Sequence, residues 1–439
     1  MSFLQRFFNV RQGEALPIFV AGLYFFFVLT ALMLLRPARD AIGMSGGLDS
    51  VRWLFIGTAL VTLIANPAFG WLVSRFRRLV FIALTYGFFA ASLVGFYLLI
   101  VMAPDAVGEV SGRVFYVWFS VFNLFSTMVF WALMADRFTL EQSKRIFGVL
   151  AVGGTLGAIF GPWLASVLAE RIGTPALMLV SAGFLILAVF AAWLVARVQP
   201  EVTAAGTVRA DDRAVIGGNA WSGISAVFRS PYLIGISGYV LVMTIIATFI
   251  YFTRLQMVAA AADDMDSQTI LFAQIDLITQ TATFVLQAVV TGHLMRKLGV
   301  SVALLLLPIV VAGGFVGLAM LGSFATLILF DAAFRAIQRA ITRPARETLF
   351  TVVTREEKYK SKAFTDTFVY RGGDVIGAWT EGLLGRLGMA LVGLASVAVP
   401  LAVAWAALGF WLGRTQQQRA ASESTDRALA PEPAPPRLT

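Results

Sequence analysis

The stretch PIFVAGLYFFFVLTALMLLR, residues 17–36, holds a single charged residue, the arginine at its end. At a helical rise of about 1.5 Å per residue, such a run spans the ~30 Å hydrocarbon core of a bilayer. Similar apolar runs follow along the chain, so the sequence predicts an all-α integral membrane protein with twelve transmembrane helices. Their approximate ranges are 17–36, 52–73, 79–102, 113–135, 146–169, 175–197, 232–252, 268–294, 301–321, 324–353, 363–386 and 389–413.

The composition narrows the class of protein further. Hydrophobic residues make up 59% of the 439 residues and charged residues 13%, and the mean hydropathy is +0.81. With no cysteine, the chain has no disulfide, thiol nucleophile or cysteine-based metal site, and His293 is its one histidine. The sequence contains no P-loop, paired zinc motif or Ser-His-Asp set, so we expect no catalytic residues, no cofactor and no metal.

The charges of the loops predict the topology. Basic residues in short loops mark the cytoplasmic side of a membrane. With both termini cytoplasmic, the basic loops fall on that side and the acidic loops face outside, so we expect a multi-pass protein of the bacterial inner membrane. The formal charge of +9 then reflects topology, and the expected macromolecular surroundings are the lipid bilayer and no nucleic acid. The basic loop residues are Arg75, Arg77, Arg78, Arg137, Lys144, Arg145, Arg355, Lys358, Lys360 and Lys362, and the acidic ones are Asp105, Glu109, Asp263, Asp264 and Asp266.

A polar stretch divides the chain into two halves. We expect an N-terminal six-helix bundle at 1–198, a cytoplasmic linker at 199–230 and a C-terminal six-helix bundle at 231–413. The tail, 414–439, has little apolar surface to bury and is predicted to be disordered. Residues 1–13 are amphipathic and lack a following cleavage site, so we expect no cleavable signal peptide.

The pentapeptide Arg36-Pro37-Ala38-Arg39-Asp40 returns as Arg343-Pro344-Ala345-Arg346-Glu347, each time at the downstream end of a long apolar run. Two arginines and an acid at a membrane helix end indicate an ion path or a gate. Because helix 1 runs outward and helix 10 inward, the first copy is expected to gate the outer side and the second the cytoplasmic side. Arginine and proline are also ordinary helix-ending residues, so anchoring alone remains open. The predicted gating residues of the two copies are Arg36, Arg39, Asp40, Arg343, Arg346 and Glu347.

Charge at bilayer depth is concentrated in the second half, because the first six predicted helices have no charged residue in their middle thirds. Such a group costs at least about 2.5 kcal/mol and normally faces a cavity or a partner. From the helical rise, Arg335 lies about 16 Å into helix 10, near the midplane. The deep set has three arginines and two aspartates, which favours an anionic substrate. The predicted substrate contacts are Arg335, Arg339, Arg371, Asn123 and Gln280, and the predicted proton-coupling residues are Asp276 and Asp374.

Local pairing is an alternative for several of these charges. Asp331 and Arg335 can pair at i,i+4 and Arg371 and Asp374 at i,i+3, so a self-neutralising ladder remains open. Asp276 has no basic residue three or four positions away, and burial of an unpaired carboxylate favours its protonated form. We therefore expect Asp276 to carry a coupling proton, with pairing to Arg335 or Arg371 across helices as the alternative.

A loop motif resembles that of the major facilitator superfamily. Residues 70–78, after helix 2, are similar to the signature G-x-L-x-D-R-x-G-R, and residues 292–299, after helix 8, repeat it weakly. Ser74 and Arg296 stand where the signature has an acid. The resemblance covers Leu16 to Gly413 and implies two helical bundles that rock about a midplane site. The residues concerned are Gly70, Leu72, Ser74, Arg75, Arg77 and Arg78, then Gly292, Leu294, Arg296, Lys297 and Gly299.

Helix 5 resembles an antiporter pattern of the same superfamily, G-x8-G-x3-G-P. The matching residues are Gly148, Gly157, Gly161 and Pro162, and the resemblance implies a gating role in an exchange-type mechanism. Small residues at this spacing also let helices pack closely, so packing alone is the alternative. In helix 11, the Gly372-Gly373 pair is interpreted similarly, as a hinge or as a place where another backbone approaches.

Three segments resemble the ADP/ATP translocase group, the nucleotide exchangers of plastids and intracellular bacteria. Leu35–Asp40, Phe130–Asp136 and Ser143–Gly148 are similar to that group's L-R-x-x-K-D, F-W-x-x-A-N and E-A-K-R-x-x-x-x-F-G segments. The resemblance implies a substrate or gating role for Arg39 and Asp40. Arg39 stands where the group has a lysine, and nucleotide specificity is not implied.

These features together predict a monomeric secondary transporter that exchanges a small organic anion, or couples it to protons, by alternating access. A nucleotide-like substrate falls within this class. One alternative is a proton-coupled exporter of amphiphilic compounds, which the helix 5 pattern favours. The other is a membrane sensor or interaction protein that does not transport.

Overall fold

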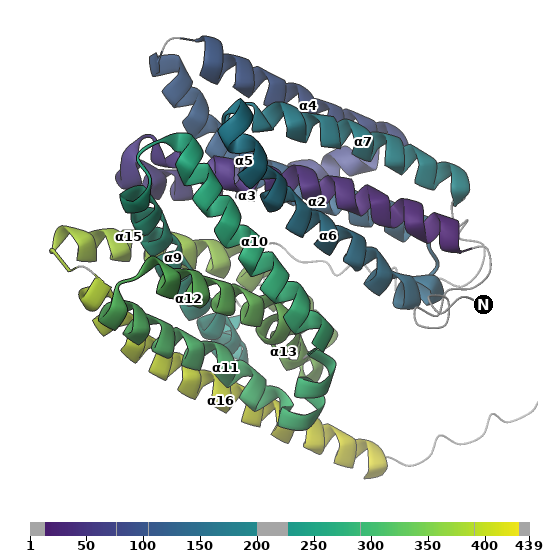
Figure 1. Cartoon of the computed structure of the whole chain (residues 1–439). Coiled ribbons are helices and arrows are strands. Elements are labelled where there is room, and N and C mark those ends of the chain that lie inside the picture. The colour runs from purple at the N-terminus through teal and green to yellow at the C-terminus, as the bar shows by residue number, and fades with distance from the viewer. Residues whose placement is uncertain are drawn as a thin grey trace, which may run out of the picture. The chain divides into compact units, whose positions relative to one another are not determined.

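The computed structural model describes residues 14–75, 77–103, 105–199, 227–289, 291–389 and 391–429, and all regular elements within these ranges are helical. The predicted all-α class is confirmed (Figure 1). The helices of the first half are α2 (Ala15–Met44), α3 (Gly47–Arg75), α4 (Arg78–Met102), α5 (Asp105–Arg137), α6 (Leu140–Ile172) and α7 (Leu177–Val198). Those of the second half are α9 (Pro231–Ala261), α10 (Met265–Val289), α11 (Thr291–Leu321), α12 (Phe324–Ile337), α13 (Arg343–Leu349), α14 (Arg355–Phe364), α15 (Tyr370–Arg386) and α16 (Leu391–Leu429).

Ten helices of the described part are long and apolar enough to cross a membrane. The other two predicted spans, 324–353 and 363–386, are each interrupted by a π-helical segment. In the first, η2 (Gln338–Thr342) joins α12 to α13, and in the second, η4 (Thr365–Val369) joins α14 to α15. Charged and polar residues crowd both spans, which lowers their hydropathy. Because π-helical turns frequently occur at functional sites, these two spans remain candidates for the transport path.

The chain forms two compact units. Among the described residues, the first unit holds α2 to α7 together with Thr248–Phe284 and Ala378–Arg386. The second holds the start of α9, Val285–Gly377 and the chain from Leu387 onward. These units differ from the two predicted halves, because parts of α9, α10 and α15 contact first-half helices and belong to the first unit.

Within the first unit, α2 packs against α5, α6 and α7. Glycines of α6 allow the closest of these approaches. A Cβ on Gly157 would overlap the carbonyl oxygen of Phe26, and one on Gly161 would lie 2.8 Å from the Leu34 nitrogen. Gly153, one turn before Gly157, meets the α2 backbone in the same way. The close-packing interpretation therefore agrees with the structure for Gly157 and Gly161 but not for Gly148, which has nothing within 4 Å of a Cβ, and the gating role of Gly157, Gly161 and Pro162 remains a prediction.

Within the second unit, α11 packs against α16. A Cβ on Gly413 would overlap Cα of Ser301, so the two backbones touch at this glycine. A Cβ on Gly373 would lie 3.0 Å from Cβ of Thr244 and 3.1 Å from the Leu241 carbonyl oxygen, both on α9. The expectation that the Gly372-Gly373 step lets another backbone approach is thus confirmed for Gly373.

The tail was predicted to be disordered from residue 414, whereas α16 runs from Leu391 to Leu429 and so includes residues 414–429. Residues 414–429 are rich in arginine, glutamine and alanine, which are good helix formers and can extend an existing helix without a buried face. The rest of the tail, 430–439, lies outside the described residues. So do residues 200–226 of the predicted linker and the amphipathic stretch 1–13.

Candidate functional site

The first pentapeptide lies inside α2 and not at its end. The helix continues to Met44 with Pro37 buried within it. Proline removes one N–H and crowds the carbonyl four residues earlier, but membrane helices tolerate it where neighbouring helices support the segment. The helix-ending interpretation is therefore wrong for this copy. Because α2 runs eight residues past Arg36, this arginine lies about 12 Å inside the helix end, deeper than an outer mouth.

Asp40, one turn beyond Arg36, is 1% exposed and accepts hydrogen bonds from three residues, of which Arg39 donates through both Nε and Nη2. Arg39 Nε donates to its Oδ1 at 2.9 Å. From α9, the Tyr251 hydroxyl donates to Oδ1 at 3.0 Å and Arg254 Nη2 donates to Oδ2 at 3.1 Å. The Tyr116 hydroxyl of α5 lies 2.9 Å from that of Tyr251, and the Arg39 guanidinium lies over the Tyr116 ring, 4.7 Å from its centroid. Tyr251 and Arg254 of the second half thus bind the carboxylate of Asp40 in the first half.

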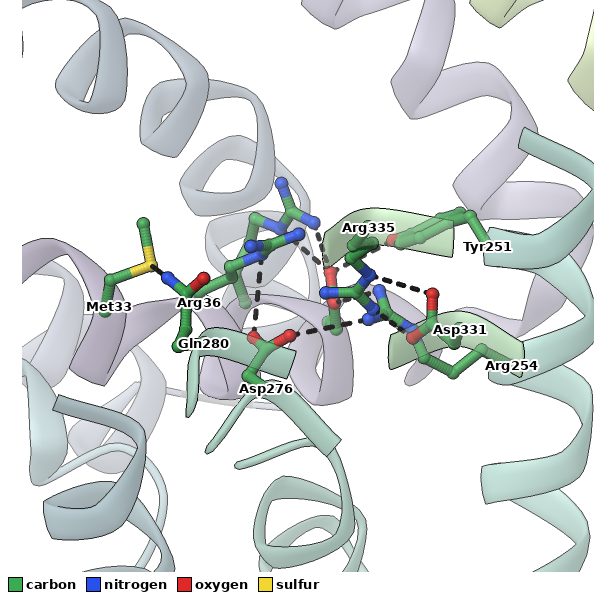
Figure 2. A network of polar contacts seen from close by, with 10 residues as sticks. Met33, Arg36, Tyr251, Arg254, Asp276, Gln280, Asp331 and Arg335 are labelled. Carbon is green, nitrogen blue, oxygen red and sulfur yellow. Dashed lines mark hydrogen bonds and ion pairs between the residues drawn. The ribbon is translucent and has the colours of Figure 1, made fainter. Parts of the chain in front are cut away.

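Asp276 of α10 lies between two arginines (Figure 2). Its Oδ2 is 3.6 Å from Arg36 Nε, and its Oδ1 is 3.6 Å from Arg254 Nη1. Asp276 thus has basic partners on other helices, which is the alternative that the sequence left open, and they include Arg36 of α2 and Arg254 of α9, which the sequence did not suggest.

Arg254 connects the two aspartates. Its guanidinium donates to Asp40 and forms an ion pair with Asp276. We call Arg36, Arg39, Asp40, Arg254 and Asp276 the Asp40–Asp276 cluster. Its three arginines exceed its two aspartates by one positive charge.

A second group of polar contacts links α3, α9 and α15. Arg52 Nη2 donates to Glu381 Oε2 at 2.7 Å, and Gln256 Nε2 donates to Glu381 Oε1 at 2.6 Å. The Arg52 guanidinium lies above the Phe252 ring, 5.3 Å from its centroid. A Cβ on Gly382 would lie 2.5 Å from Arg52 Nε, so only glycine leaves room for the arginine here. The three polar residues, Arg52, Gln256 and Glu381, are here called the Glu381 latch. Each lies five residues inside its helix end, so the latch joins three helices at one level.

A third link joins the turn after α6 to the start of α10. The Thr174 amide donates to Asp266 Oδ1 at 2.7 Å, and the hydroxyls of Thr174 and Thr269 lie 2.9 Å apart. All three links belong to the first unit. Each one connects helices of the first half with helices of the second half.

Two predicted pairs lie in the second unit. Arg335 Nε donates to Asp331 Oδ1 at 2.8 Å, and Arg371 Nη1 donates to Asp374 Oδ2 at 3.2 Å. Both i,i+4 and i,i+3 pairs foreseen from spacing are confirmed. Arg339, the remaining predicted contact on these helices, lies in η2 and is partly buried.

The second pentapeptide begins α13, with Pro344 in its first turn. Proline suits that position because its missing N–H has no partner there. Arg346 Nη2 lies 3.7 Å from Asp366 Oδ1, and Lys362 Nζ lies 2.6 Å from Glu347 Oε2. Arg343 is exposed. These residues therefore form ion pairs between the two interrupted spans, and their gating role remains a prediction.

Two polar residues predicted as substrate contacts differ in burial. Gln280 lies one turn beyond Asp276, is 7% exposed, and its amide nitrogen is 3.5 Å from the Met33 sulfur. Asn123 is exposed, and its backbone carbonyl accepts from the Thr127 hydroxyl. The structure thus places Gln280, and not Asn123, beside the Asp40–Asp276 cluster.

Sequence reasoning missed Arg254, Tyr251 and the residues of the Glu381 latch. Arg254 is 1% exposed, yet it stands two residues past the predicted end of its span at 252, because α9 continues to Ala261. A search restricted to the middle thirds of spans also excluded Arg52 and Glu381. The sequence did contain a signal for the latch: Arg52 and Glu381 are opposite charges, and each lies near the end of its predicted helix on the same side of the membrane. Asp40 and Arg52 of the first half are thus buried charged residues, in addition to those that the sequence places in the second half.

Comparisons with known proteins agree with this architecture. The family model of the Major Facilitator Superfamily matches residues 15–359. A bacterial homologue of the human lysosomal transporter Spinster, in an inward-facing and unoccupied conformation, has a TM-score of 0.64 at 13% identity, covering 93% of this chain and 99% of that one.

Two other solved transporters are similar in fold. A mutant of the nucleoside transporter NupG has a TM-score of 0.59 at 12% identity, covering 92% of this chain and 99% of its own. The POT family transporter PepTSo has a TM-score of 0.60 at 11% identity, covering 93% and 98%. At such identities the likeness concerns the fold alone. Comparison with curated protein sequences gives no match.

Proposed function

We propose that this chain, which belongs to the major facilitator superfamily, exchanges a small organic anion across a bacterial inner membrane by alternating access. Membership of that family makes the chain a multi-pass secondary transporter of a small molecule, and not an enzyme. The anionic substrate, the exchange mode, the monomeric state and the cytoplasmic position of both termini are the proposed parts.

One observation carries the choice of an anion. The Asp40–Asp276 cluster holds one more arginine than aspartate; Asp40, Arg254 and Asp276 are buried, and Arg36 and Arg39 are partly buried, with side-chain exposures of 21% and 16%. Burial of an uncompensated charge is unfavourable, and an anion of one charge would neutralise it. The Asp331–Arg335 and Arg371–Asp374 pairs of the second unit each contain one arginine and one aspartate, so they do not change the excess of one positive charge.

The same cluster supports exchange. Its ion pairs join first-half and second-half helices, so they must separate when this end of the transporter opens. An empty carrier closes around an uncompensated charge, whereas a carrier loaded with a monoanion closes around a neutral site. Closing is therefore more favourable when a substrate is bound, which is the behaviour of an exchanger. The resemblance of Leu35–Asp40 to the ADP/ATP translocases agrees with this role for Arg39 and Asp40, and nucleotides belong among the candidate substrates.

A proton-coupled exporter has less support. Gly157 and Gly161, two of the three helix 5 glycines that favoured it, pack against the α2 backbone, so close packing accounts for these two without an exporter's mechanism. Asp276 was expected to couple protons because no basic residue lies three or four positions away in its own helix. Arg36 and Arg254 of other helices lie beside this carboxylate, so that argument no longer supports proton coupling. Asp374, paired with Arg371, remains as the other predicted coupling residue.

Counterflow into proteoliposomes tests the proposal. Liposomes holding purified protein would be loaded with succinate, inorganic phosphate or ADP and assayed for uptake of the same labelled anion. We expect uptake to require an internal anion and to persist without a pH gradient. Arg36→Gln should abolish it, whereas Arg113→Gln, which removes an exposed arginine paired with Glu109, should not. Absence of counterflow with a wider anion panel, or wild-type uptake by Arg36→Gln, would remove the proposal.

A further inference from the structure

The last helix of each half carries the same short pattern where its apolar run gives way to polar chain. Residues 193–199, at the end of α7, read WLVARVQ, and residues 410–416 of α16 read FWLGRTQ. Each segment has an aromatic residue, an arginine four positions later and a glutamine two positions after that. Because residues four apart share a helix face, each arginine can fold back over its aromatic ring.

Both arginines do lie over these rings. The Arg197 guanidinium is 3.8 Å from the centroid of the Trp193 ring, and the Arg414 guanidinium is 4.6 Å from the centroid of the Phe410 ring. Contact within about 6 Å is a cation–π interaction, which restrains a side chain that is otherwise very mobile. Both arginines are exposed, and in the described part of the chain neither one forms a salt bridge or a side-chain hydrogen bond. Their N–H donors are therefore oriented by the rings and accessible to an acceptor outside the protein.

The rings themselves face outward. Trp193 is 39% exposed and Phe410 is 40% exposed, and Phe190 stacks on Trp193 with 5.6 Å between the ring centroids. At the end of a membrane helix such rings lie at the boundary between acyl chains and headgroups, and an arginine beyond them reaches the level of the phosphates. A guanidinium binds a phosphate through two parallel hydrogen bonds. The combination of ring and arginine thus matches both parts of a phospholipid.

The α16 copy has a second arginine. The Arg419 guanidinium lies over the Tyr232 ring of α9, 4.5 Å from its centroid, and the Tyr232 hydroxyl donates to the Leu349 carbonyl oxygen at 2.9 Å. This hydrogen bond holds the ring in place. Arg419 also forms no salt bridge with the side chains that the structure describes. Five residues separate Arg414 from Arg419, which is about 7.5 Å of helical rise, so α16 offers two cations where α7 offers one.

We propose that Arg197 with Trp193, and Arg414 with Phe410, form two headgroup sites for an anionic phospholipid, in which the guanidinium binds the lipid phosphate and the ring packs against the acyl chains. Two unpaired arginines favour a lipid of net negative charge over a zwitterionic lipid, whose own cation offsets the phosphate. The partner is a bilayer lipid and not the transported molecule, so this inference goes beyond the proposed function. With the proposed topology, both sites lie in the cytoplasmic leaflet.

Lipid binding by the full-length protein tests this inference. Purified protein in detergent would be titrated with phosphatidylglycerol or phosphatidylcholine, and the bound lipids measured by native mass spectrometry. Wild type should bind phosphatidylglycerol more tightly, and Arg197→Gln and Arg414→Gln should each weaken one site about fivefold, which is the attraction that one arginine near a membrane surface contributes. The double variant should weaken both sites. Arg113→Gln, which removes an exposed arginine paired with Glu109, is the matched control and should bind as wild type does.

Removal of the rings separates a formed site from general attraction between charges. Trp193→Leu and Phe410→Leu keep the arginines but leave them mobile, so binding of phosphatidylglycerol should weaken several-fold. Unchanged binding in the ring variants or in the arginine variants, or equal binding of the two lipids by wild type, would overturn the inference. Displacement of the lipid by millimolar inorganic phosphate would show a site for soluble anions and overturn it as well. These outcomes leave anion exchange untouched, and absence of counterflow would leave the lipid sites untouched, so the two proposals fail separately.

Discussion

Removal of the Glu381 carboxylate is expected to open the end of the transporter at which α3, α9 and α15 meet. Glu381 and Arg52 have side chains that are 5% and 9% exposed, and their ion pair is 2.7 Å long. Loss of one partner of a buried pair typically costs about 3–5 kcal/mol. In Glu381→Gln the amide can still bond to Gln256, and Arg52 keeps its contact with the exposed Asp49. Because these contacts remain, we expect Glu381→Gln to destabilise the closed state by at most about 3 kcal/mol, the lower end of that range.

This free energy acts on a conformational equilibrium. In the open state Arg52 and Glu381 are hydrated, so the substitution destabilises the closed state alone. A change of 1.4 kcal/mol is tenfold in an equilibrium constant, so about 3 kcal/mol raises the open population up to roughly 100-fold. The population of the open state, and not the stability of the fold, is the quantity to measure.

The absence of cysteine from the chain makes a labelling assay direct. Thr253→Cys introduces a near-isosteric thiol at a position that is 1% exposed and lies three residues before Gln256 on the same face of α9. A membrane-impermeant maleimide should label it slowly in the parent and up to roughly 100-fold faster with Glu381→Gln, because labelling follows the open population. Equal labelling rates in the two proteins would refute the reasoning. Glu109→Gln, which breaks only an exposed ion pair, should leave the rate unchanged.

Three other expectations concern separate parts of the molecule. Gly157→Ala should lower thermal stability in detergent by an amount equivalent to about 1–3 kcal/mol, since its Cβ overlaps the α2 backbone, whereas Gly148→Ala should be neutral because nothing lies within 4 Å of that Cβ. Arg335→Ala should abolish anion counterflow and destabilise the protein; if Arg335 serves only to neutralise Asp331, the double substitution of both by alanine will restore transport. Hydrogen bonds from Ser267 hold the pKa of Asp264 below its usual value of 3.8, so its support of the α10 N-terminus is present above that pH and lost as pH falls below it. Hydrogen exchange at the start of α10 should therefore accelerate below about pH 4 in wild type and show no such step in Asp264→Asn.

Local pairs were accessible from the sequence. Asp331 and Arg335 share a helix face because they are four residues apart, and Arg371 and Asp374 because they are three apart. Both pairs form in the structure. The prediction needed only the helical repeat, which depends on the backbone and not on the rest of the fold.

Pairs between distant helices were not accessible. Arg254 and Asp40 are 214 positions apart, and Arg52 and Glu381 are 329 apart. No periodicity connects such residues. The ends of α2 and α9 were also predicted too early, at residues 36 and 252, whereas the helices continue past Arg36 and Arg254 to Met44 and Ala261. Inside the protein these arginines form ion pairs with Asp40 and Asp276, so the helices can continue past them.

The sequence by itself determined that this protein crosses a membrane as a bundle of helices and belongs with secondary transporters, because long apolar runs and local spacing are properties of the chain alone. Only the tertiary structure decided which charges meet. It placed Arg36 and Arg254 around Asp276, although the sequence suggested a solitary carboxylate. The physical reason is that a buried charge is stabilised by whatever countercharge packing brings within a few ångströms, and packing joins helices that are hundreds of residues apart in the chain.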